Sequence, residues 1–142
     1  MTPGSHKIGE IKGLDAGIQQ KLEADGIHTV EDLLRDTETS QQRSALAKKL
    51  GVEGSQLTEW INRADLMRLK GVGKEMANLL EECGVDSCKE LQHRKADNLH
   101  TKLKETNDAR KITHHAPTLA QVEDWIHEAA MLTAQTTQHM QH

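Results

Sequence analysis

Aromatic residues are almost absent from this chain. Its 142 residues include two tryptophans, Trp60 and Trp125, and neither phenylalanine nor tyrosine. β-Sandwiches and barrels usually draw on aromatic and β-branched side chains. The composition therefore predicts an all-α fold, in which the two tryptophans are core residues.

Long apolar runs and a cysteine framework are also missing. No run of about eighteen apolar residues occurs, which argues against a helical membrane span. Residues 1–10 lack the hydrophobic region of a signal peptide, and two cysteines do not make a disulfide scaffold. We therefore expect a cytoplasmic protein that does not act at a membrane.

The charge balance is mildly acidic. The chain carries 18 Lys and Arg residues against 22 Asp and Glu residues, a formal net charge of −4. Proteins that bind nucleic acid strongly usually carry a basic surface. The acidic balance is therefore evidence against strong binding of DNA or RNA.

One short stretch has the pattern of a tight turn that runs directly into a helix. Leu69-Lys70-Gly71-Val72-Gly73 is followed by an amphipathic run over residues 74–80, which includes the small residue Ala77. The glycines permit backbone conformations that a Cβ disfavours. They also leave backbone N–H groups uncovered at a helix N-terminus, where an anion can bind.

The chain contains an internal repeat. A shift of 58 positions places residues 11–34 over residues 69–92, so that Gly13 meets Gly71 and Gly26 meets Gly84. A shift of 65 places Trp60 over Trp125, which requires a seven-residue insertion between residues 94 and 118. We expect a first repeat at 8–68, a second repeat at 69–132 packed on it, and a flexible polar tail at 133–142.

Local signals predict helices along the whole chain. Thr29 with Asp32 and Thr118 with Gln121 have the spacing of capping boxes, Ser55 is expected to cap a long helix, and Gly51 is expected to end another. The expected helices cover about residues 16–26, 29–34, 40–50, 55–68, 74–83, 87–93 and 97–106, with a last one from about residue 119.

The span from Ile8 to about Leu132 resembles a family of uncharacterised bacterial domains built as tandem helix-hairpin-helix units. The resemblance is carried by Ile11-Lys12-Gly13-Leu14, Gly26-Ile27 with Thr29-Val30 and Asp32-Leu33-Leu34, Trp60 to Arg68, Leu69 to Gly73, Asn98-Leu99 and Gln121 to Ile126. It implies two hairpin units related by a pseudo-twofold. The broader helix-hairpin-helix class binds double-stranded DNA through backbone phosphates, without reading sequence, or binds partner proteins.

The two hairpins differ in their fitness for phosphate. In the first, Asp15 replaces the second glycine, and its carboxylate would repel a phosphate, so we expect a purely structural turn there. In the second, the predicted phosphate-binding residues are Lys70, Gly71, Val72, Gly73 and Lys74. A purely structural turn is the alternative interpretation for this hairpin too.

A basic zone follows the second hairpin, between residues 94 and 111. Lys102 and Lys104 are the residues of this zone that we expect to contact further phosphates. Acidic residues are mixed with the basic ones, which is also typical of an ordinary solvated helix face. No aromatic residue lies in the zone, so binding of single strands by base stacking is not expected.

No metal site or catalytic site is predicted. Cys83, Cys88 and His93 recur at five-residue steps, which is not a zinc spacing. The repeat places Cys88 at a core position and Cys83 at a more exposed one. His114-His115 fits a solvated loop, and no nucleophile elbow, phosphate-binding loop or HExxH helix occurs. We expect neither a cofactor nor an enzymatic activity.

Two hypotheses about function remain open. The first is a non-catalytic module that binds double-stranded DNA through the second hairpin and the basic zone. The second is a protein-interaction or scaffolding module in which both hairpins are structural. The intact Gly71 and Gly73 turn favours the first hypothesis, whereas the acidic balance and Asp15 favour the second.

Overall fold

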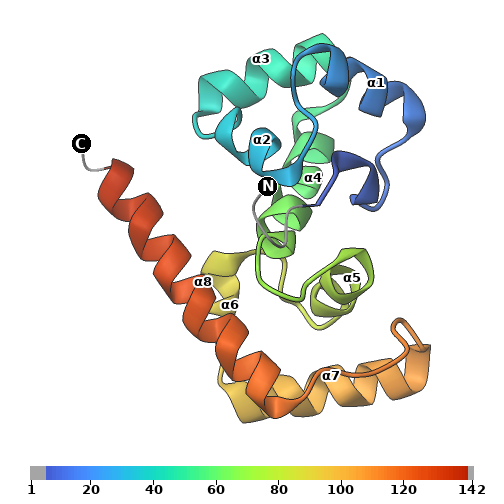
Figure 1. Cartoon of the computed structure of the whole chain (residues 1–142), viewed down its shortest axis with the longest axis vertical. Helices are drawn as coiled ribbons and strands as arrows, with labels where there is room; N and C mark the ends of the chain where they lie inside the picture. The colour runs from blue at the N-terminus through green and yellow to red at the C-terminus, as the bar shows by residue number, and fades with distance from the viewer. Residues whose placement is uncertain (1–5, 141–142) are drawn as a thin grey trace. The chain divides into compact units, whose positions relative to one another are not determined.

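The computed structural model describes residues 6–140, and the side chains of residues 6–134. Within this part of the chain there are eight α-helices, a short 3-10 helix and no β-strand, so the all-α prediction is confirmed (Figure 1). The chain divides into two compact units, Met1–Lys74 and Glu75–His142. The sequence predicted a boundary between residues 68 and 69. The boundary in the structure, between residues 74 and 75, leaves the Leu69–Gly73 turn in the first unit.

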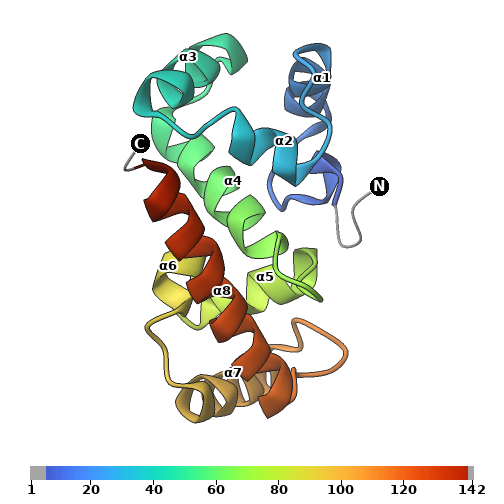
Figure 2. The same ribbon diagram turned by 60° about the vertical axis from the view of Figure 1, so that its left-hand side comes forward.

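The first unit is built around helix α4. It contains the 3-10 helix η1 (Ile8–Glu10) and the helices α1 (Ala16–Ala24), α2 (Val30–Arg35), α3 (Ser40–Leu50) and α4 (Gly54–Met67). Helices α2 and α3 both pack on α4, and α1 packs on α3 and η1 (Figure 2). Leu57, Trp60 and Ala64 recur at three- and four-residue steps on α4 and are buried, which makes one apolar face.

The second unit is built around helix α8. Helix α5 (Lys74–Glu82) leads into it, and α6 (Cys88–Leu91), α7 (Ala96–Arg110) and α8 (Leu119–Met140) follow. Helices α6 and α7 pack on α8, which Figure 1 shows as the longest helix. Val122, Trp125 and Ala129 form its buried face. The burial of Trp60, 3% exposed, and of Trp125, 2% exposed, confirms both as core residues.

Most of the helix ends follow the signals in the sequence. The capping box of Thr29 and Asp32 forms in both directions, and so does that of Thr118 and Gln121. Gly51 ends α3 in the left-handed conformation, at φ +72°. Ser55 was wrongly predicted as a cap: α4 begins at Gly54, after Glu53, whose side chain caps nothing. Ser55 therefore lies inside the first turn.

Residues 94–118, where the sequence predicted an insertion, contain α7 and the loop after it. Asn107, a buried polar residue of α7, donates from Nδ2 to the Thr113 carbonyl and accepts from the Thr113 N–H at 2.8 Å. Both polar ends of this amide are thereby satisfied, as a buried polar group requires. The two hydrogen bonds hold the loop that follows α7 against the helix.

The last helix extends beyond the expected apolar stripe. Helix α8 continues to Met140, through most of the segment for which the sequence predicted a polar tail. The last two residues of that tail, 141 and 142, lie outside the described part of the chain, and its flexibility stays a prediction. Among the described helices, none is long and apolar enough to cross a membrane.

Candidate functional site

The second glycine turn joins α4 to α5. Gly71 adopts φ +84°, a conformation that glycine tolerates and other residues rarely do. The Val72 N–H donates to the Leu69 carbonyl at 3.1 Å, and both of these side chains are buried. Val72 therefore holds the turn in place, and its N–H is already used within it.

Gly73 has no structural need to be glycine. It is not among the residues with positive φ, and a Cβ at this position would lie 3.8 Å from His6 Cε1, its nearest neighbour among the described residues, which is ordinary van der Waals contact. Helix α5 begins at the next residue, and both Lys70 and Lys74 are exposed. Gly73 therefore contributes no side-chain cap to the N-terminus of α5.

His6 is a neighbour of this turn that the sequence did not reveal. Its side chain, 22% exposed, lies against Gly73, and its Nδ1 lies 3.3 Å from a carboxylate oxygen of Glu10. The His6 carbonyl accepts from the Val30 N–H at 2.9 Å, which fixes the backbone of this segment. Because His6 and Gly73 lie near opposite ends of the first unit's sequence, their contact leaves no local pattern by which it could be found.

The first glycine turn has the same conformation and a different surface. Gly13 adopts φ +87°, and the Arg63 guanidinium donates to the carbonyl of Lys12. A Cβ at Gly13 would lie 3.2 Å from Arg63 Nη1 and 3.7 Å from Trp60 Nε1. Side chains of α4 therefore cover this turn.

Asp15 completes the closure of the first turn. Its Oδ1 accepts from the Ile18 N–H at 2.8 Å, so the carboxylate caps the N-terminus of α1. The 58-residue shift of the sequence places Asp15 over Gly73. An anion approaching α1 would meet a negative charge and an N–H group that is already bonded.

The two lysines of the basic zone do not share one helix face. Lys102 and Lys104 are both exposed on α7, but residues two apart point to different sides of a helix. Two arginines of the zone are engaged by carboxylates: Arg94 with Glu90 at 3.1 Å, and Arg110 with Glu82 at 2.6 Å. Lys102 and Lys104 also belong to the second unit, whereas the turn residues Lys70 to Lys74 belong to the first.

The charge is unevenly divided between the units. Residues 1–74 hold 11 basic and 11 acidic residues, whereas residues 75–142 hold 7 basic and 11 acidic residues. The whole formal charge of −4 therefore belongs to the second unit. Long-range electrostatics thus favour approach of a polyanion to the first unit over the second.

Both cysteines are core residues. Cys88 is 1% exposed, as expected, whereas Cys83 is fully buried and its Sγ lies 3.4 Å from Thr106 Oγ1, so the exposure expected for Cys83 is wrong. Within the described residues, no group of three or more His, Cys, Asp or Glu side chains is placed to hold a metal ion.

The fold defines an all-α protein of two helical units, each with a buried tryptophan on its central helix. The model of a family described as "Domain of unknown function (DUF4332)" matches residues 12–132, and the chain belongs to that family. Neither the curated proteins nor the solved structures gave a match to this chain.

Proposed function

We propose that the protein is a non-catalytic helix-hairpin-helix module that binds backbone phosphates of double-stranded DNA without reading sequence. The contacts are made by Lys70, Gly71, Gly73 and Lys74 at the start of α5. The observation that carries this proposal is that Gly73, just before α5, is glycine although neither its backbone conformation nor its described neighbours require it, so that it places no side chain over the start of this helix. A helix N-terminus offers N–H donors and a favourable dipole to a phosphate.

The helix-hairpin-helix assignment is supported by the matching architecture of the two units. The first repeat shift relates the starts of α1 and α5, at Ala16 and Lys74, and the second shift relates the starts of α4 and α8, at Gly54 and Leu119. In the first unit α2 and α3 pack on α4, and in the second α6 and α7 pack on α8. The pseudo-twofold that the resemblance implies stays a prediction.

The supporting charges come from the flanking lysines more than from α7. Lys70 and Lys74 are exposed on either side of the two glycines. Lys102 and Lys104 point to different sides of α7, so a single phosphate surface would engage at most one of them. We therefore expect few phosphate contacts, a weak affinity and a shallow dependence on salt.

The test is a change of Gly73 to Asp in the full chain. The new carboxylate would stand where the phosphate binds and would cap α5 as Asp15 caps α1, so the fold should persist and gain a few tenths of a kcal/mol. We expect binding to a fluorescent DNA duplex, followed by anisotropy at about 50 mM salt, to be lost.

The matched control is Gly17→Asp. Gly17 lies in the first turn of α1, and a Cβ there meets only the Asp15 carboxylate, at 3.4 Å. This variant adds the same charge to the same unit and should retain most of the affinity. The DNA proposal is wrong if the unaltered protein shows no binding at low salt, or if the two variants lose affinity equally.

The second candidate function is a protein-interaction module. It is favoured by the first turn, which Arg63 and Trp60 cover and Asp15 caps, and by the net charge of the second unit. On this hypothesis both turns serve only the fold, and Gly73→Asp leaves the binding of the partner protein intact.

A further inference from the structure

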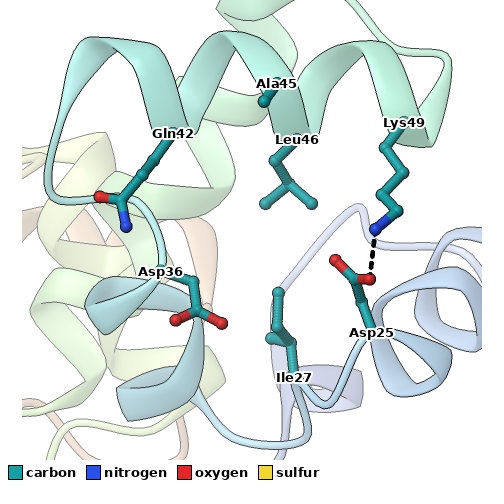
Figure 3. Close-up of a pocket in the computed structure, with 7 residues that line it drawn as sticks. All are labelled: Asp25, Ile27, Asp36, Gln42, Ala45, Leu46 and Lys49. Atoms are coloured by element: carbon teal, nitrogen blue, oxygen red, sulfur yellow. Dashed lines mark hydrogen bonds and ion pairs between the residues drawn. The ribbon is translucent and has the colours of Figure 1, made fainter.

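A hollow of about 240 Å³ opens in the first unit beside helix α3 (Figure 3). One wall is a single face of α3, formed by Gln42, Ala45, Leu46 and Lys49 at steps of three and four residues. Gln42 is held in place because its side-chain oxygen accepts from the Thr39 N–H at 3.0 Å. This wall therefore belongs to a helix with a defined start.

The opposite wall is formed where α1 and α2 end. Asp25 and Asp36 are the C-cap residues of these two helices, and the buried Ile27 lies on the same side of the hollow. Helix C-termini carry partial negative charge, which adds to that of the two carboxylates. Figure 3 shows Leu46 and Ile27 facing each other across the middle, with Asp36 toward one end and the Asp25–Lys49 pair toward the other.

The charge of the hollow is set by Asp36. Lys49 Nζ lies 2.5 Å from Asp25 Oδ1, so these two charges offset each other. Asp36 is paired with Arg35, whose Nε lies 3.2 Å from Asp36 Oδ1, but the Arg35 side chain is 62% exposed and is not part of the lining. Exposed pairs of this kind contribute little, so a second cation can compete for Asp36.

The volume of the hollow suits a single side chain and is small for a cofactor. Pockets for small molecules usually enclose about 300–1,000 Å³, more than this hollow offers. An apolar middle with a carboxylate at one end matches a flexible aliphatic chain that ends in a cation. Lysine has this form, since its methylenes can cover apolar surface while its ammonium stays near water.

We propose that this hollow receives a lysine side chain of a partner protein. The ammonium group binds Asp36, and the methylenes pack chiefly on the exposed Ala45, with Ile27 and Leu46 as the floor of the hollow. The proposal goes beyond the binding of DNA, because no residue of the hollow belongs to the phosphate site, and either function can fail without the other.

The experiment is an NMR titration of the ¹⁵N-labelled full chain with the capped amino acid N-acetyl-lysine-N-methylamide. We expect saturable shifts of the backbone amides of Ala45, Leu46 and Lys49 at millimolar concentration. The norleucine analogue, which keeps the aliphatic chain and lacks the ammonium, should bind about fivefold more weakly. Equal binding of the two compounds would show an apolar side-chain pocket and would overturn the proposal, as would the absence of saturable shifts.

Two variants, with one control, test which residues of the hollow contact the lysine side chain. Asp36→Asn should weaken the lysine compound about fivefold, whereas Glu38→Gln, a change of the same charge on an exposed residue outside the lining, should leave its affinity unchanged. Ala45→Met, at an exposed position, should fill the hollow and abolish binding. An unchanged affinity in Asp36→Asn or in Ala45→Met would overturn the proposal.

Discussion

The two glycine turns have similar backbone conformations at their first glycine and differ in the side chains around them. Gly13 and Gly71 adopt φ +87° and +84°, and each turn precedes a nine-residue helix. At the first turn, Arg63 donates to the Lys12 carbonyl and Asp15 caps the helix. At the second, Gly73 stands just before α5 and contributes no side-chain cap. The same φ at the first glycine thus precedes a helix that a carboxylate caps in one place and a helix preceded by a second glycine in the other.

The difference teaches that a glycine pattern defines a shape before it defines a function. Positive φ at the first glycine is required by the turn in both cases. The second position is free to vary, because Asp15 and Gly73 both precede a helix without positive φ. Under the proposed function, the binding of a phosphate at such a turn depends on that second residue and on the side chains packed over the turn.

The largest effect is expected at the tryptophans. Trp60→Ala and Trp125→Ala each remove a large buried side chain, and each should lower the free energy of unfolding by about 3–5 kcal/mol. Chemical denaturation followed by circular dichroism measures this. A loss within experimental error at either residue would break the correspondence between α4 and α8.

The ends of α3 and α7 allow a second comparison. Both helices end in the left-handed conformation, but Gly51 supplies it in the first unit and Lys111, at φ +53°, in the second. A non-glycine residue costs roughly 1–2 kcal/mol there. Lys111→Gly should therefore stabilise the protein by about 1 kcal/mol and Gly51→Ala should destabilise it by a similar amount, as thermal unfolding would show. The same sign for both changes would contradict the comparison.

Removal of the Asp15 cap should have an effect of about 1 kcal/mol. Asp15→Ala deprives the Ile18 N–H of its acceptor and should lower the free energy of unfolding by about 0.5–2 kcal/mol. Gly73→Ala is the matched change at the other turn, and it removes no side-chain cap. Urea denaturation that gave equal losses for the two variants would show that Asp15 does not act as a cap.

The smallest expected effect is on the dependence of folding stability on pH, through Asp32. The backbone N–H of His28 is the main group that lowers the pKa of Asp32, and the Thr29 capping box and Arg35 act in the same direction. A carboxylate with a lowered pKa stabilises the folded state above its unfolded pKa, and this contribution is lost as pH falls through the folded value. Asp32→Asn should therefore lose less stability than the unaltered protein between neutral pH and about pH 3. Parallel pH profiles would refute this.

Local patterns predicted much of the fold. The bounds of α3 were expected because Gly51 marks its end, and the Thr29 and Thr118 capping boxes placed two helix starts. The end of α7 was placed too early, near residue 106, because Lys111 performs the role of a C-terminal glycine without being one. A helix end that depends on a strained lysine has no compositional signal.

Contacts between distant segments explain what the sequence did not reveal at the candidate site. Arg63 reaches Lys12, and His6 lies against Gly73, although the two residues of each pair are far apart in the sequence. Cys83 was expected to be exposed because its repeat counterpart is Asp25, yet Thr106 of the longer α7 lies against it. Periodicity identifies the buried face of a helix, but it does not identify which distant side chain covers a turn.

The two buried indoles also have a spectroscopic consequence. Trp60 belongs to the first unit and Trp125 to the second, and the chain has no tyrosine or phenylalanine to add to its ultraviolet emission. Each unit therefore contains a single intrinsic fluorophore. In a protein with one tryptophan replaced by phenylalanine, the red shift of the remaining indole during denaturation reports the opening of one unit alone, without any attached dye.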